Sequence, residues 1–174
     1  MTKLVPLAIA FTAVLLAPGC GYHVAGHTDL LPAKIKTIAI PPFHNATARY
    51  RLTDRLPNAL TREFMARTRY RIVPDPATAD AILQGAVLTY NTWPTVFDPV
   101  TGRAAGVQLS VTIRITLTDR STGKVLFDRP SMEFKERYEI STDQRAYFEE
   151  SDVAVDRLSL EVARTLVSAI LENF

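Results

Sequence analysis

The most regular feature of the sequence is the segment from Val107 to Leu117, in which apolar and polar residues alternate without interruption. Alternation with a period of two is the pattern of a β-strand that has one buried and one exposed face. A register shift of one residue would bury Arg114 and the polar residues beside it, which costs free energy. The segment therefore predicts a strand of fixed register in a sheet whose other face meets solvent or a partner.

Further segments predict the rest of this sheet. Apolar, β-branched runs at Lys34–Ile40 and Ala81–Tyr90 predict two strands, and Arg71–Val73 is a candidate short strand. Residues 119–123 predict a hairpin loop, followed by an antiparallel strand over 124–140. Within that strand the proline at position 130 requires a sheet edge or a bulge. In contrast, the stretch from Asn91 to Gly106 has no period, so a loop is expected to follow Tyr90.

Two helices complete the predicted fold. Leucines and a phenylalanine four residues apart form one helical stripe from Leu52 to Phe64, and a second stripe lies within Ser151–Asn173. Amphipathic helices and a half-exposed sheet bury their apolar faces against each other. The sequence thus predicts a two-layer α+β domain over residues 34–174. Its elements follow the order β-α-β-β-β-α, with two helices on one face of the sheet.

The only cysteine, Cys20, divides the chain into unlike parts. Before it, Lys3 precedes an apolar segment, Leu4–Ala17, that is shorter than the roughly 20 residues of a membrane-spanning helix. This pattern predicts a lipoprotein signal peptide at 1–19, a lipidated Cys20, and a tether at 20–33. Ala17 occupies a position where lipoproteins usually have leucine, so a conventional signal peptide that leaves a free thiol is the alternative.

Charge and composition narrow the classes of function. The chain has 20 basic and 18 acidic residues, a balance that argues against nucleic-acid binding. The charges are segregated, because residues 49–71 are rich in arginine and residues 139–156 are rich in acids. The three histidines, His23, His27 and His44, lack the cysteine or acidic partners of a metal site. No nucleophile motif or phosphate-binding glycine loop is present, so the sequence predicts neither an enzyme nor a bound cofactor.

Binding is the remaining class of function. The exposed face of the predicted hairpin carries several cations, and the neighbouring loop adds an arginine and two aromatic residues. Such a combination suits an amphiphile that carries phosphate groups, because guanidinium pairs with phosphate through two hydrogen bonds. An ordinary solvated sheet face is the alternative. The candidate ligand-binding residues are Arg114, Lys135, Arg137, Arg103 and Lys124, and the candidate partner-binding residues are Trp93 and Phe97.

Several short motifs lie in a characteristic order along the chain. They are Gly19-Cys20-Gly21-Tyr22-His23, Ile35–Phe43 with Asn45, Ala79-Asp80, and Leu83-Gln84-Gly85, together with the alternating strand and the closing helix. In this order they resemble the LptE family of lipopolysaccharide-assembly lipoproteins. The resemblance implies two helices on a mixed sheet of four or five strands. It also implies a non-catalytic protein of the outer membrane that plugs the LptD β-barrel and binds lipopolysaccharide.

A different class of function also fits part of the pattern. Lipoprotein regulators of cell-wall synthases have a similar strand that ends in Pro-Phe with an asparagine nearby, here Ile40 to Asn45. Such regulators carry a long tether that reaches through the cell wall. Residues 21–33 are too short for that reach, so the sequence favours a partner close to the membrane.

Overall fold

The computed structural model describes residues 31–49, 51–99, 102–140 and 144–172, and side chains are described for all of these except 144–150. The predicted signal peptide, Cys20 and nearly all of the predicted tether lie outside these ranges. The elements, in chain order, are β1 (Thr37–Ala39), β2 (His44–Asn45), α2 (Leu52–Arg67), β3 (Arg71–Val73), the 3₁₀ turn η1 (Pro76–Thr78), β4 (Ala81–Phe97), β5 (Ala104–Asp119), β6 (Val125–Glu139) and α3 (Gln144–Glu172).

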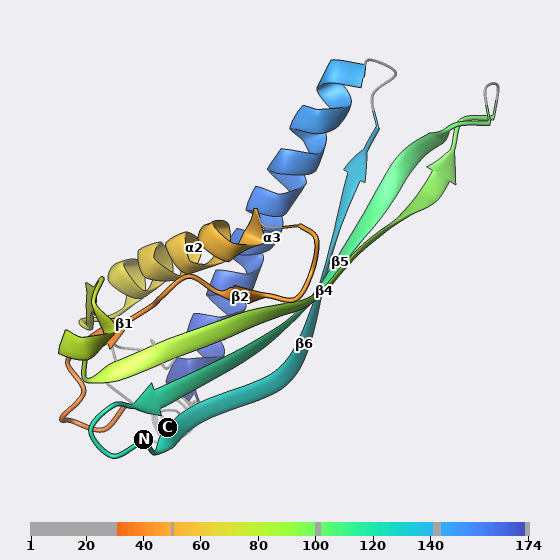
Figure 1. The fold of residues 1–174 in the computed structure, drawn as a ribbon. Coiled ribbons are helices and arrows are strands. Elements are labelled where there is room, and N and C mark those ends of the chain that lie inside the picture. Colours follow the sequence, from red (N-terminus) through yellow and green to blue (C-terminus); the bar gives the residue numbers. More distant parts are fainter. Residues whose placement is uncertain (1–30, 50, 100–101, 141–143, 173–174) are drawn as a thin grey trace, which may run out of the picture.

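The strands form one mixed sheet in the order β3-β1-β4-β5-β6, and β2 pairs separately with β4. The short strands run parallel to their neighbours, whereas β4, β5 and β6 form a long antiparallel meander. The β5–β6 turn contains Gly123 at φ +69°, a conformation that glycine adopts without steric cost. Both α2 and α3 lie on one side of the sheet and pack against each other (Figure 1). The α+β class with two helices on a mixed sheet is therefore confirmed, with β2 as an additional strand.

The core lies between the helices and the alternating strand. Every apolar residue predicted to face inward on β5, from Val107 to Leu117, is buried. They meet the helical stripes, of which Leu56, Leu60 and Phe64 in α2 are fully buried. Each such side chain contributes on the order of 1.5–3 kcal/mol when removed from water. The period-two and four-residue spacings thus identified the two faces that pack together.

Pro130 lies at a β-bulge in an edge strand, as its place in the sequence predicted. Strand β6 is the sheet edge, and its register with β5 shifts between the pairs Ile113–Met132 and Ile115–Arg129. Pro130 falls within this bulge, where no ladder hydrogen bond is required of it.

Two predicted boundaries are wrong. The stretch from Asn91 to Phe97, expected as a loop, continues β4 and pairs with the start of β5. Register shifts on either side of Val96 accommodate Pro94 and disrupt the period that would have marked a strand. The last helix begins at Gln144, earlier than the apolar stripe from Ser151 indicated. In Figure 1 the extended β4–β5 hairpin projects at one end of the molecule, and we call residues 91–106 the arm.

Candidate functional site

Three of the candidate ligand residues, Arg114, Lys135 and Arg137, lie on the sheet face that the helices leave uncovered. Because side chains alternate along a strand, the inward direction of Val111 and Ile113 places Ser110, Thr112 and Arg114 on the opposite face. Cross-strand partners share a face, so Lys135, opposite Ser110, lies there too. We call this surface the open face.

Strand pairing brings one aromatic residue and two cations together on the open face. Trp93 pairs with Gln108, which pairs with Arg137, and in the next row Asn91 pairs with Ser110, which pairs with Lys135. Neighbouring strands lie about 4.8 Å apart, so each row spans roughly 10 Å. Trp93 is 39% exposed. We call these six residues the Trp93 patch: Asn91, Trp93, Gln108, Ser110, Lys135 and Arg137.

Glu133 restrains one of the two cations in the patch. Lys135 Nζ lies 3.1 Å from Glu133 Oε2, and the Ser110 hydroxyl donates to Glu133 Oε1 at 2.7 Å. The Ser110 hydrogen bond, assisted by Lys135, holds the pKa of Glu133 below its usual range. The side chain of Arg137 has no hydrogen-bond or ion-pair partner among the described residues. Of the two cations in the patch, Arg137 is therefore the one that no described side chain restrains, and it is the better candidate to bind an anion.

Arg114 lies apart from this patch, beside a second feature of the open face. His44 pairs with Ala86, which pairs with Arg114, so these residues form one row across three strands. The row lines a shallow hollow of about 490 Å³ whose walls are Pro41, Pro42, His44, Gln84, Gly85, Ala86, Arg114 and Thr116. Arg114 is four residues from Ser110 on β5, which corresponds to about 13 Å along the strand. Arg114 thus does not share a single contact site with Lys135 and Arg137.

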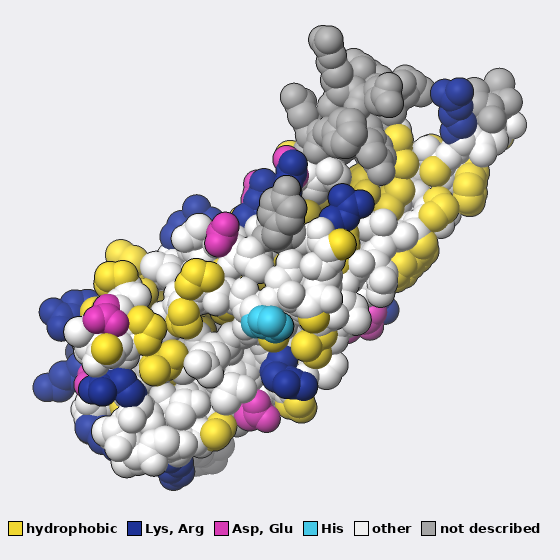
Figure 2. All heavy atoms as spheres, viewed as in Figure 1, with side chains coloured by type: hydrophobic (Ala, Val, Ile, Leu, Met, Phe, Trp, Pro, Cys, Tyr) yellow, Lys and Arg dark blue, Asp and Glu magenta, His cyan; other side chains and the backbone are white. Residues whose placement is uncertain are grey.

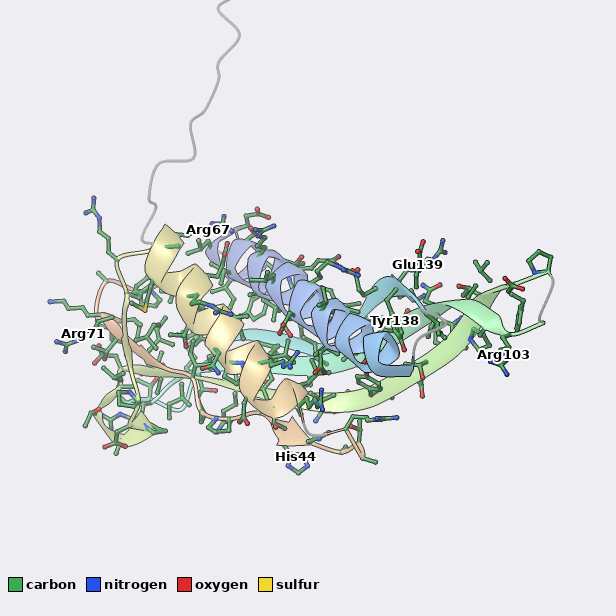
Figure 3. The ribbon with its side chains drawn as sticks, turned by 90° about the horizontal axis from the view of Figure 1, so that it is seen from above. His44, Arg67, Arg71, Arg103, Tyr138 and Glu139 are labelled. Carbon is green, nitrogen blue, oxygen red and sulfur yellow. The ribbon has the colours of Figure 1, made fainter. Side chains whose placement is uncertain are left out.

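The remaining candidate residues lie at opposite ends of the sheet. Arg103 is at the tip of the arm, where its carbonyl accepts a hydrogen bond of 2.8 Å from the Asp98 N–H. In Figure 3 Arg103 lies at one end of the molecule, and Arg67 and Arg71 lie at the other. Lys124 follows the β5–β6 turn at the latter end. The five predicted cations are therefore spread along the whole sheet.

The arm exposes apolar side chains that a solvated hairpin would not require. Phe97 is 57% exposed and Val96 is 50% exposed, close to Trp93 on the same strand. Figure 2 shows hydrophobic side chains gathered on the part of the molecule that forms this projection. Exposed apolar groups that lie together are typical of interaction sites. Val96 was missed in the sequence because the stretch around it has no period.

The segregated charges of the sequence meet between the helices. Arg55 Nη1 lies 2.9 Å from Asp156 Oδ1 and donates to the carbonyl of Asp152 at 2.9 Å, while Arg51 forms an ion pair with the Asp152 carboxylate. Part of the arginine-rich segment therefore stabilises the packing of α2 on α3. It is not available for a ligand.

Two aspartates that the sequence did not single out for a role hold the strand starts together. Asp80 Oδ2 accepts hydrogen bonds from the N–H groups of Lys36 and Thr37, both at 2.9 Å, and from the Thr37 hydroxyl at 2.8 Å. These contacts, led by the Lys36 N–H, lower the pKa of Asp80. Asp80 belongs to the Ala79-Asp80 motif, and the structure shows that its carboxylate joins β1 to β4.

Asp119 has the same role at the β5–β6 turn. Its buried side chain forms an ion pair with Lys34 and accepts hydrogen bonds from the Ser121 N–H at 2.9 Å and the Ser121 hydroxyl at 2.7 Å. The Lys34 contact, followed by that from Ser121, holds the pKa of Asp119 well below its usual range. Both aspartates are structural residues.

Within the part of the chain that the structure describes, no group of three or more His, Cys, Asp or Glu side chains is placed to hold a metal ion. His44 is exposed beside the hollow, and His23 and His27 lie outside the described residues. Among the described helices, none combines the length and the apolar character that crossing a membrane would require.

Comparisons with solved structures support the fold. Lipoprotein B from Nitrosomonas europaea matches with a TM-score of 0.56 and 16% identity over 87% of this chain and 96% of that one. Rare lipoprotein B from Shewanella oneidensis matches with a TM-score of 0.50 and 16% identity over 78% and 94% of the two chains. A hypothetical protein from Chlamydia trachomatis gives 0.51 and 11% identity over 79% and 96%. At these identities the likeness concerns the fold alone.

The family comparison is more specific. No curated protein gives a significant match to the sequence. The family model described as "LptE: Lipopolysaccharide-assembly", however, matches residues 35–170, which include all the strands and helices except the last residues of α3. This chain therefore belongs to the LptE family of lipopolysaccharide-assembly proteins.

Proposed function

We propose that this protein is a non-catalytic lipoprotein of the outer membrane, cleaved before Cys20 and anchored there on the periplasmic side. It forms a plug complex with an LptD-type β-barrel and takes part in the transport and assembly of lipopolysaccharide, which it binds. The observation that carries the proposal is the family match over residues 35–170, which covers nearly the whole folded domain. The exposed arm and the cations of the open face supply the surfaces that such a role requires.

The Trp93 patch is the proposed centre of lipopolysaccharide binding. Arg137, which has no side-chain partner in the described part of the chain, can form paired hydrogen bonds with a phosphate, and Lys135 adds a second positive charge nearby. Trp93, which pairs with Gln108 on the neighbouring strand, offers an apolar surface. Arg103 at the arm tip and Arg114 in the hollow extend this cationic surface, whereas Lys124 is too distant to contribute to the same contact. The patch thus matches an amphiphile with phosphates beside an apolar part.

The proposed partner-binding surface is the arm. Its strand exposes Trp93, Val96 and Phe97 well away from the helical core. We expect the full-length protein, purified from detergent-solubilised membranes, to bring with it a large outer-membrane β-barrel. The double variant Trp93→Ser/Phe97→Ser should recover at least tenfold less barrel. The double variant Met65→Ser/Leu160→Ser, which alters exposed apolar residues on the helices, is the matched control. Isolation of the wild-type chain without any barrel would contradict the plug complex.

Lipopolysaccharide binding is tested by charge reversal. The triple variant Arg114→Glu/Lys135→Glu/Arg137→Glu should bind lipopolysaccharide at least tenfold more weakly, because each charge-assisted hydrogen bond contributes about 1.5–3 kcal/mol. Arg137→Glu alone should account for the largest share of the loss. Its matched control is Arg62→Glu, an exposed arginine on α2 that also has no partner among the described residues. Unchanged binding by the triple variant would exclude the open face as the ligand site.

A further inference from the structure

The end of the molecule opposite the arm carries a concentration of cations that the proposed binding surfaces do not use. It comprises the starts of β1, β3 and β4 and the β5–β6 turn. Figure 2 shows several Lys and Arg side chains at this end, and Figure 3 shows Arg71 there. We call it the basic end, and its exposed cations are Lys34, Lys36, Arg67, Arg69, Arg71, Arg120 and Lys124.

Most of these charges are not neutralised by other residues that the structure describes. Lys34 forms an ion pair with Asp119, and Arg67 forms one with Glu63. Arg120 donates to the carbonyl of Ala79. The side chains of the other four, Lys36, Arg69, Arg71 and Lys124, have no hydrogen-bond or ion-pair partner among the described residues.

The acidic groups that the structure describes at this end do not offset those four cations. Asp80 and Asp119 are occupied by internal hydrogen bonds, and Glu63 by Arg67. Asp75 and Glu172 are exposed, and Asp75 accepts a hydrogen bond from the Ala77 N–H. The surface that remains is positively charged.

The first described residue of the chain packs at the basic end. Leu31, the first described residue, is buried, and its N–H donates to the Tyr70 hydroxyl at 3.2 Å. Tyr70 is itself buried between Arg69 and Arg71 in the sequence, and both arginines are exposed. The first described residue therefore contacts a tyrosine that lies, in the sequence, between two of the exposed cations of the basic end.

The length of the segment between Cys20 and Leu31 limits how far the basic end can lie from the anchor. Cys20 is separated from Leu31 by ten residues, so a fully extended chain reaches at most about 40 Å. Strand β4, which starts at the basic end, has 17 residues and extends for about 55 Å toward the arm tip. A lipid anchor at Cys20 thus keeps the basic end within about 40 Å of its membrane, whereas the arm tip lies up to about 55 Å farther along the domain.

We propose that the basic end is a second membrane contact, which binds the anionic phospholipid headgroups of the leaflet that holds the Cys20 lipid. The inference rests on the lipid anchor of the proposed function and adds the orientation of the domain. Lipid-modified proteins combine an acyl anchor with a cationic patch in this way. Each Lys or Arg beside an anionic surface increases binding roughly fivefold. The contact directs the arm away from this leaflet.

The test uses the lipidated full-length protein in vesicles, without a barrel or lipopolysaccharide. Because the only native thiol is the lipidated one, Ala77→Cys in η1 introduces a single site for an environment-sensitive fluorophore at the basic end. The expected spectral shift is at least about threefold larger on vesicles with phosphatidylglycerol than on pure phosphatidylcholine, and it disappears at high salt. The same fluorophore at Thr95→Cys in the arm should give no difference between the vesicles.

Charge reversal identifies the residues responsible. Arg69→Glu/Arg71→Glu should reduce the shift at position 77 to its value on phosphatidylcholine, whereas Arg103→Glu/Arg137→Glu, with the same change in net charge, should leave it intact. Equal shifts on both vesicles, or a lipid-dependent shift at position 95 instead, would overturn the inference while leaving the anchor in place. Failure of the protein to attach to either vesicle would instead contradict the anchor, and with it the proposed function.

Discussion

The two halves of β4 form one continuous strand but have opposite environments. In the first half, Ala81, Leu83 and Val87 are fully buried beneath the helices. In the second half, every residue from Asn91 to Phe97 is exposed, although the strand still pairs with β5. The backbone hydrogen bonds are thus satisfied in both halves, and only the first half gains hydrophobic stabilisation from a second layer.

This difference separates stability from binding along a single element. Side chains in the covered half contribute to the free energy of unfolding, so substitutions there are expected to be costly. Side chains in the arm contribute little to folding, which leaves them available to a partner. Matched substitutions in the two regions test that division.

The largest expected contrast is between two phenylalanines. Phe64 in α2 is fully buried, whereas Phe97 in the arm is 57% exposed. Phe64→Ala should lower the free energy of unfolding by about 3–5 kcal/mol, because it leaves a cavity in the core. Phe97→Ala should change it by less than about 0.5 kcal/mol. Urea denaturation followed by circular dichroism measures both, and comparable losses would show that the arm belongs to the core.

Aspartates provide the next contrast. Asp80→Ala removes three hydrogen bonds that join β1 to β4 and should cost about 2–3 kcal/mol, since bonds to charged groups are the stronger ones. Asp128→Ala removes one exposed bond from Thr116 and should cost less than about 1 kcal/mol. The same denaturation experiment compares them. If Asp80→Ala were as stable as Asp128→Ala, the carboxylate would not be what holds β1 to β4.

A pair of glycines on the long strands gives a smaller effect. A methyl group at Gly85 would collide with the ring of Phe43, which is buried, so Gly85→Ala should cost about 1–3 kcal/mol. At Gly106 in the arm, the new methyl group would lie 3.2 Å from Cβ of the half-exposed Val96, where the structure is able to adjust. Thermal unfolding should therefore show a lower midpoint for Gly85→Ala than for Gly106→Ala. The reverse order would contradict the close packing of Phe43 on β4.

The smallest expected effect is a dependence of the free energy of unfolding on pH, which originates in two aspartates outside the arm. Folding lowers the pKa of Asp119 and Asp80 below the value of about 3.9 of an unfolded aspartate. The stabilisation that the two ionised carboxylates give to the folded protein is fully present above about pH 4. It is lost as the pH falls toward their pKa values in the folded protein, because the unfolded chain binds more protons. Urea midpoints measured from pH 7 to pH 3 should decline less steeply in Asp119→Asn than in the wild type. Superimposable profiles would show that Asp119 does not couple protonation to folding.

Much of the architecture could be predicted because burial leaves a periodic trace in the sequence. The inward residues of β5 and the stripe of α2 were identified from spacing alone, and Pro130 correctly indicated an edge or bulge. The arm was mistaken for a loop because its side chains are exposed on both faces. Without burial no alternation is required, and register shifts around Val96 removed what remained of it.

The candidate site was predictable in its residue types but not in its grouping. The residues that carry positive charge could be named from the sequence, yet only strand register shows that Trp93 lies in one row with Arg137 and that Arg114 lies elsewhere. The roles of Asp80 and Asp119 could not be predicted either. Each carboxylate binds a segment that is distant in the sequence, Thr37 for Asp80 and Lys34 for Asp119.

The sequence by itself determined the class of fold, because hydrophobic periodicity dictates which faces must be buried, and its motifs indicated the family. The tertiary structure decided which charges are free and where they lie. Ion pairs between distant segments neutralise Arg55 and Lys34, whereas the side chains of Arg137, Arg69 and Arg71 have no partner among the described residues. The contacts that neutralise Arg55 and Lys34 join segments about a hundred and about eighty-five residues apart, and such contacts have no counterpart in local sequence.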